Sequence, residues 1–309
     1  MQSQRLFGAL ALAATLGASA CSSASDASSS TSTPTTLTPT TLNPETSTSA
    51  ASTSASSTPA ESSTPPDTDA MSPGMDMGHG APATGLALRV LATSASVGSP
   101  TDLSFIIDGA DGRPITSYEV EQTKKLHLVV VRSDLSNYQH IHPTMAGDGT
   151  WSIPATFAVG GTYRLVADFT PVIDAMPAGR TSLTADLTVD GAGSDTALPD
   201  PASTTSVDGY TVAIAGRLTS GTTSGLTFTI TDGAGRPVTL EPYLGAYGHL
   251  VAFAQADLAY THIHPASADR AGGVVMFEGV VAAPGRHRLF MQFATAGTVH
   301  TAEFTIDAG

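Results

Sequence analysis

Short stretches in which apolar and polar residues alternate recur along the chain from about Gly85 to its last residue. Alternation with a period of two places the apolar side chains on one face of an extended segment, which is typical of a half-buried β-strand. Clusters of Gly, Asp and Pro separate the stretches, as turns require. In the first half we expect strands at residues 86–91, 103–107, 150–153, 161–169 and 183–189.

The same order of stretches returns in the second half. The strand predicted at residues 226–230 repeats the one at residues 103–107, and an Asp-Gly turn ending in Arg-Pro follows both. Short alternating strands at this spacing predict an all-β protein. The repeat divides it into two tandem immunoglobulin-like β-sandwich domains, at residues 85–191 and 207–309, joined by a polar linker.

The N-terminus has the layout of a secretory signal. A short apolar segment, residues 6–17, follows a weakly basic start and precedes Ala18-Ser19-Ala20-Cys21. We therefore predict a signal peptide at residues 1–20. Small residues directly before a cysteine resemble the lipobox of bacterial lipoproteins, which implies that Cys21 is acylated and anchors the chain to a membrane. An ordinary cleaved signal with an unmodified Cys21 is the alternative.

Residues 21–80 form the predicted tether between this anchor and the first sandwich. Up to about residue 69 they are almost entirely Ser, Thr, Ala and Pro. Such a segment buries too little apolar surface to offset the entropy of ordering, so we expect it to be disordered. The tether ends in a Met/His-rich segment with Met71, Met75, Met77 and His79. Thioethers suit Cu(I), which makes these side chains candidate copper ligands; a low-complexity linker end is the alternative.

Charge and cysteine content narrow the possible functions. The formal net charge is -14 with only 13 Lys and Arg, which argues against a nucleic-acid partner. The single cysteine, Cys21, allows no internal disulfide and leaves both predicted sandwiches without a thiolate. With the signal peptide, these features predict an extracytoplasmic protein held at the cell membrane.

Six of the nine histidines fall in two copies of one pattern. His127 precedes His140-Ile141-His142-Pro143 by thirteen residues, and His249 precedes His262-Ile263-His264-Pro265 by the same distance. The spacing persists although the sequence between the histidines changes. This favours a common task, and metal binding is the first candidate.

Strand geometry explains how such a pattern could hold an ion. Residues two apart on a strand point to the same face, so His140 and His142 lie together. If the segments flanking residues 132–137 pair as a hairpin, His127 lies opposite one of them, with about 5 Å between Cβ atoms. Three imidazoles so placed can share an ion at about 2 Å per bond. We therefore predict one three-His site per sandwich, the second formed by His249, His262 and His264.

Further side chains could complete these sites. Aligning the last strands puts His300 in the place of Leu183, and we prefer His300 as a fourth ligand. Met145 and Met176 could extend the first site.

Other residues near the histidines could act as hydrogen-bond partners. Asp134 and Asp257 follow the first histidine of each pattern by seven and eight residues and could orient a ring. Tyr138 and Tyr260 stand two residues before each His-Ile-His and could bond the histidines if these are structural core residues.

The ligand type indicates the metal. Three imidazoles without sulfur suit copper or zinc. Affinity at a nitrogen site is higher for copper, and the Met/His-rich segment adds a preference for it, so copper is the first choice and zinc the second. A blue-copper electron-transfer centre is excluded because it needs a Cys thiolate.

On these two histidine patterns, the chain resembles bacterial envelope copper-handling proteins with immunoglobulin-like domains of the YtkA/FixH and CopC kind. The resemblance covers both sandwiches. It implies metal binding, storage or delivery to a protein partner, and no catalysis.

Three functions remain open from the sequence. The first is a membrane-tethered copper-binding lipoprotein that sequesters or delivers the ion. The second is a metal-free cell-surface binding or adhesion module with structural histidines. The third, an enzyme with an open three-His site, is disfavoured because the sequence shows neither a nucleophile elbow, nor a phosphate loop, nor His-Glu-x-x-His.

Overall fold

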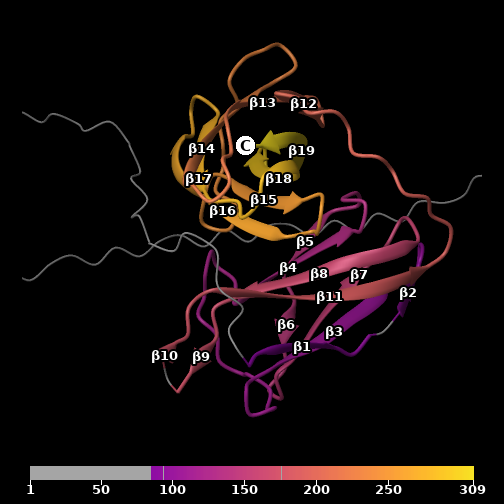
Figure 1. The fold of residues 1–309 in the computed structure, drawn as a ribbon. Coiled ribbons are helices and arrows are strands. Elements are labelled where there is room, and N and C mark those ends of the chain that lie inside the picture. The colour runs from indigo at the N-terminus through magenta and orange to yellow at the C-terminus, as the bar shows by residue number, and fades with distance from the viewer. Residues whose placement is uncertain (1–84, 93, 175) are drawn as a thin grey trace, which may run out of the picture. The chain divides into compact units, whose positions relative to one another are not determined.

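The computed structural model describes residues 85–92, 94–174 and 176–309, and within them the regular structure is all β (Figure 1). The predicted all-β class with two immunoglobulin-like sandwiches is confirmed, and all the described residues belong to one compact unit. The predicted signal peptide, Cys21, Met71, Met75, Met77 and His79 lie outside these residues. In the described part of the chain, no helix has the length and hydrophobicity needed to cross a membrane.

The first sandwich packs a four-stranded sheet of order β1-β3-β7-β6 against a five-stranded sheet of order β2-β11-β8-β4-β5. β2 runs parallel to β11, and the other paired strands are antiparallel. A short β9–β10 hairpin precedes β11. The strands are β1 (Ala87–Val90), β2 (Ser94–Ser96), β3 (Thr101–Asp108), β4 (Leu126–Arg132), β5 (Gln139–Ile141), β6 (Thr144–Met145), β7 (Thr150–Ala155), β8 (Gly161–Phe169), β9 (Val172–Ile173), β10 (Met176–Pro177) and β11 (Thr181–Asp190).

The second sandwich repeats the core of this plan, without counterparts of β2 and of the β9–β10 hairpin and with an added edge strand, β12. Its strands follow one another in the order β12-β13-β14-β17-β16-β15-β18-β19, because β16 pairs with β15 through its first residues and with β17 through its last. In the first sandwich the equivalent strand is broken into β5 and β6. The strands are β12 (Thr204–Val207), β13 (Tyr210–Gly216), β14 (Ser224–Thr231), β15 (His249–Ala254), β16 (Tyr260–Asp269), β17 (Val274–Gly279), β18 (Gly285–Thr295) and β19 (Thr298–Ala308).

Both faces of β4 are buried. Leu126, Leu128 and Val130 point into the core of the first sandwich. The alternate residues Val129 and Val131 belong to a separate apolar cluster that draws on both sandwiches. The continuous apolar run of this strand therefore has a simple cause, since neither face meets solvent. β15 is built in the same way, and all six of its residues are buried.

The cluster shared by the two sandwiches, called here the interface cluster, is assembled from equivalent positions. Val129 and Val251 each stand two residues after the first histidine of their pattern, and Val131 and Phe253 each stand four after it. Val166 of β8 and Phe290 of β18 each lie five residues into their strand. Each sandwich therefore packs against the other through the same face. The buried members are Val129, Val131, Leu135, Val166, Val251, Phe253 and Phe290.

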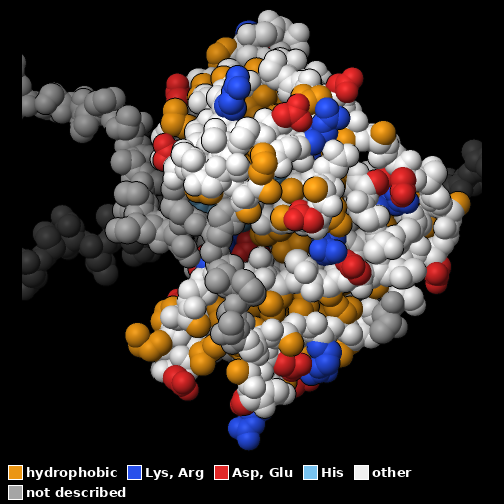
Figure 2. All heavy atoms as spheres, viewed as in Figure 1, with side chains coloured by type: hydrophobic (Ala, Val, Ile, Leu, Met, Phe, Trp, Pro, Cys, Tyr) orange, Lys and Arg blue, Asp and Glu red, His pale blue; other side chains and the backbone are white. Residues whose placement is uncertain are grey.

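The charged side chains, unlike those of the interface cluster, do not gather in one place on the face that Figure 2 draws. On the face drawn in Figure 2, acidic and basic groups are scattered among polar and apolar ones and form no large patch of one sign.

Candidate metal centre

The β4–β5 hairpin brings the first three histidines together. Its register pairs Leu128 with Ile141 and Val129 with His140, and it continues toward His127 and His142. The connecting loop turns through two residues with positive φ, Leu135 at 63° and Asn137 at 53°. The hairpin that we predicted from the spacing is therefore present.

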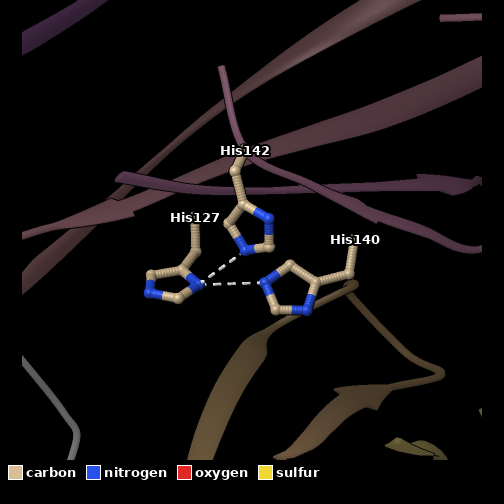
Figure 3. A group of neighbouring side chains, drawn as sticks. All are labelled: His127, His140 and His142. Carbon is tan, nitrogen blue, oxygen red and sulfur yellow. Dashed lines mark hydrogen bonds between the residues drawn. The ribbon is translucent and has the colours of Figure 1, made fainter. Parts of the chain in front are cut away.

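Three ring nitrogens converge in this hairpin (Figure 3). His127 Nδ1 lies 3.0 Å from His140 Nε2 and 3.2 Å from His142 Nε2. One nitrogen from each ring falls within 4.8 Å of the others. Nitrogens bound tetrahedrally to one zinc ion at about 2 Å are separated by about 3.3 Å, so this spacing is close to that of a ligand set.

In His127 and His140, the ring nitrogen that points away from the other histidines has a hydrogen-bond partner of its own. These outer contacts decide which nitrogen of each ring carries the proton. His127 Nε2 lies 3.1 Å from the carbonyl oxygen of Glu121, which can only accept. His140 Nδ1 lies 2.7 Å from the side-chain oxygen of Gln292, whose amide nitrogen donates to Thr301 Oγ1. Both outer nitrogens therefore carry the proton. His127 Nδ1 and His140 Nε2 then face each other with two lone pairs.

These imidazoles are neutral at physiological pH. Burial, followed by the neighbouring His127, lowers the pKa of His140 to about 4. Burial, followed by His140 and His127, lowers the pKa of His142 to about 3. The pKa of His127 is also lowered, chiefly by burial. Neutral rings keep the lone pairs that a metal ion needs.

The second hairpin, β15–β16, repeats this register and pairs Val251 with His262. Among the described residues, however, only the first trio brings one nitrogen of each ring within 4.8 Å of the others. The ring centroids of His249 and His262 are 4.1 Å apart, and those of His262 and His264 are 4.8 Å apart. Here a side chain of the first sandwich intervenes, because the guanidinium of Arg180 contacts His264 Nε2 and His262 Nδ1.

The two sets of histidines adjoin. The ring of His249 lies 4.5 Å from that of His140 and 5.6 Å from that of His127, centroid to centroid. We expected one separate site per sandwich, but the structure gathers these rings into one group. The histidine cluster, as we call it, consists of the first trio His127, His140 and His142 and the second trio His249, His262 and His264.

Each sandwich supports the histidines of the other. Asp168 of β8 pairs with His127 across the strands, yet its Oδ2 lies 2.8 Å from His262 Nδ1 of the second sandwich. Gln292 of β18 pairs with His249 across the strands, yet it accepts from His140 of the first. The exchange is reciprocal, as expected where equivalent faces meet.

Asp168 is the charged centre of this arrangement. Arg180 forms two hydrogen bonds to it, of 2.8 and 2.7 Å, and the Tyr260 hydroxyl donates a third of 2.8 Å. Burial acts to raise the pKa of Asp168, but Arg180 and His262 outweigh it and hold that pKa well below its ordinary value. Asp168 is therefore ionised and paired.

His249 is the least satisfied member of the cluster. Its side chain is buried, and among the described residues neither ring nitrogen has a hydrogen-bond partner. His262 Nε2 is also buried without a hydrogen-bond partner among the described residues. Burial, with neighbouring cationic and imidazole groups, lowers the pKa of both rings well below its ordinary value. A buried polar atom without a partner is costly unless something binds it.

His300 does not belong to the cluster, so its prediction as a fourth ligand was wrong. His249 pairs with Gln292 and Gln292 with Thr301, which puts these three residues on one face of the sheet. His300 is one residue away and points to the other face, where it bonds Asp208 at 2.8 Å. The register also makes Thr181, and not Leu183, its equivalent, because Thr181 pairs with Phe169 as His300 pairs with Phe293.

The other candidate ligands and partners also lie elsewhere. Met145 packs against the core of the first sandwich, and Met176 is 68% exposed. Asp134 bonds Arg132 and Ser136, and Asp257 accepts from the Ala259 amide, so neither orients a histidine as we had suggested. Tyr260 bonds Asp168 instead of a histidine, and Tyr138 stacks on Phe290 at 4.0 Å between centroids.

Asp168, Arg180 and Gln292 were missed from the sequence. Asp168 and Gln292 carried a usable signal, because each is a polar residue in an otherwise apolar stretch at the equivalent position of β8 and β18. Arg180 carried none, since it follows a hairpin that has no counterpart in the second sandwich.

Comparison with known proteins gives a family but no activity. No curated protein matches the chain. Among solved structures, the Escherichia coli adhesin FdeC is 21% identical over 74% of this chain, with a TM-score of 0.25, and the chain spans 65% of its length. The Yersinia pseudotuberculosis adhesin InvE is 14% identical over 72% of this chain, with a TM-score of 0.22, and the chain spans 59% of its length. Similarity at these scores carries no argument about function.

The family comparison is more direct. The family described as "Domain of unknown function (DUF8832)" matches twice, at residues 82–182 and 205–309. The two matches correspond to the two sandwiches and together cover most of the chain. The chain therefore belongs to this family and carries its domain in two tandem copies.

Proposed function

We propose that this chain is an extracytoplasmic metal-binding protein that holds one ion at His127, His140 and His142. The observation that carries the proposal is the convergence of three ring nitrogens, with His127 Nδ1 3.0 Å from His140 Nε2 and 3.2 Å from His142 Nε2. The hydrogen bonds of the outer nitrogens assign lone pairs to His127 Nδ1 and His140 Nε2. Two neutral acceptors at this distance repel each other unless a proton or a metal ion lies between them. The lowered pKa values disfavour the proton, so a metal ion is the better occupant.

Copper is the preferred ion and zinc the second choice. Imidazole nitrogens bind copper more tightly than zinc, and a third nitrogen, His142 Nε2, completes a three-coordinate set. Hydrogen bonds from the outer nitrogens to Glu121 and Gln292 hold two of the rings in position, as partners of metal-binding histidines commonly do. The protein would sequester the ion or deliver it to a partner, from an anchor at Cys21 and with the Met/His-rich segment as a first point of capture.

One feature favours a second candidate, a metal-free surface-binding module. The histidines lie beside the apolar interface cluster, and their hydrogen bonds to Asp168 and Gln292 join the two sandwiches. In this alternative the histidines fasten the sandwiches together and bind no ion.

Ion stoichiometry separates the two candidates. The metal-free full-length chain would be titrated with Cu(I), Cu(II) and Zn(II) and weighed by native mass spectrometry. We expect one tightly bound ion, lost when His140→Ala is combined with His142→Ala. The control is His287→Ala, which removes a buried histidine that bonds its own strand at Gly285. If the unsubstituted chain binds no ion tightly, or the double variant keeps its ion, the metal-binding proposal fails.

A further inference from the structure

The two trios differ in the charge that surrounds them. The second trio contacts the guanidinium of Arg180, which reaches it from the segment between β10 and β11 of the first sandwich. Arg180 is itself nearly buried, with 10% of its side chain exposed, and is also 3.4 Å from Glu121. A permanent cation therefore lies against two of the three imidazoles of this trio.

The equivalent positions of the second sandwich are neutral. Arg180 directly precedes Thr181, as Val299 precedes His300, and Thr181 and His300 occupy the same place in the strand pairing. By the same pairing Asp168 corresponds to Gln292. The Gln292 amide therefore borders the first trio where Asp168 borders the second. Arg180 also acts on the first trio, through its charge on His127 and His140, but its printed contacts are with His262 and His264.

The second trio contains buried ring nitrogens without hydrogen-bond partners among the described residues. His249 is 1% exposed and both its ring nitrogens lack partners among the described residues, as does His262 Nε2. His262 Nδ1 bonds the carboxylate of Asp168, an arrangement that orients metal-binding histidines in many proteins. In the third ring of the trio, His264 Nε2 is contacted by the guanidinium of Arg180.

We propose that Arg180 takes the place of a metal ion in the second trio, so that the native chain binds a single ion although it carries two histidine trios. The guanidinium neutralises Asp168, contacts His262 and His264, and repels a second cation. Removing its charge would leave Asp168 ionised beside His262 and would let the imidazoles of this trio close on a divalent copper or zinc ion. This inference rests on the proposed function in so far as the imidazoles of this cluster bind metal ions.

The experiment counts ions in the full-length chain before and after Arg180→Gln. Metal-free protein would be titrated with Zn(II) and with Cu(II), and the bound ions counted by native mass spectrometry. We expect one ion in the native chain and two in the variant, with the second lost again when His262→Ala is added. The matched control is Arg164→Gln, which removes an arginine paired with Asp186 on an exposed part of the same sandwich and should leave one ion.

Loss of Arg180 also leaves a buried carboxylate unpaired, which could unfold the variant. A second variant that combines Arg180→Gln with Asp168→Asn removes both charges and keeps a hydrogen-bond acceptor for His262; it too should bind two ions. An equal number of ions in the native chain and in the folded variants overturns the inference, and so do two ions in the native chain. A native chain with none and a variant with one His262-dependent ion would support the role of Arg180 while refuting the proposed site at the first trio.

Discussion

Protonation of His140 offers a direct measure of how the cluster is buried. In the metal-free protein the pKa of His140 is lowered from 6.5 to about 4 by burial and by His127. In the unfolded chain the ring recovers its ordinary pKa. Between the two values the unfolded state binds more protons than the native state, so the stability of the fold must fall as the pH falls through this window.

The size of the effect follows from the shift. A His140 pKa of about 4 in place of 6.5 corresponds to about 3 kcal/mol of stability, present at about pH 7 and largely lost at about pH 4. The ring is partly exposed, and screening by solvent reduces the figure, so we expect about 2 kcal/mol for this histidine alone. The lowered pKa values of His127 and His142 act in the same direction.

The assay is chemical denaturation across this pH range with a chelator present, on the native chain and on His140→Gln. Glutamine cannot be protonated but keeps a polar side chain near Gln292. The native chain should lose about 2 kcal/mol more than the variant between about pH 7 and about pH 4. Equal pH dependence in both chains would mean that His140 titrates normally, and the argument for facing lone pairs would then be wrong.

Two further pairs of substitutions test the packing and the backbone. Phe290→Ala removes a fully buried ring that stacks on Tyr138 at 4.0 Å, and should cost about 3 kcal/mol or more in denaturation, while Met276→Ala, at a side chain 39% exposed, should cost less than about 1 kcal/mol. Similar losses in the two variants would contradict a buried interface cluster. Gly273→Ala places a Cβ 2.5 Å from the Ile230 carbonyl oxygen at a φ of 66°, whereas Gly112→Ala, at a φ of 74°, meets no atom within 4 Å. We expect a loss of about 1 kcal/mol for Gly112→Ala and clearly more for Gly273→Ala, and thermal unfolding midpoints in the reverse order would refute this.

The hairpins and strands could be predicted because their causes are local. Alternation marked the strands, and the thirteen-residue spacing placed His127 opposite its His-Ile-His. The use of the two faces of β4 could not be predicted, because an apolar run gives no sign of which side meets solvent. The answer came from a second sandwich that covers Val129 and Val131.

The make-up of the histidine cluster could not be predicted, because it depends on contacts between residues that lie far apart in the sequence. His140 and Gln292 are 152 residues apart, and His262 and Asp168 are 94 apart. Nothing in the spacing of the histidines indicates that the two patterns meet. The error at His300 had a narrower cause, since an alignment displaced by two residues still placed it in the right strand, and only the pairing showed that it faces away from the cluster.

The interface cluster, built from equivalent positions, also determines how the histidine cluster responds to dilution. A lone sandwich could cover this face only by finding a second molecule, and such a pair would separate as its concentration fell. In this chain residues 191–203 join the two sandwiches covalently, between the end of β11 and the start of β12. A tether of this kind maintains an effective local concentration of about millimolar order, however few molecules are present. Every chain therefore carries its own assembled histidine cluster, even at trace abundance.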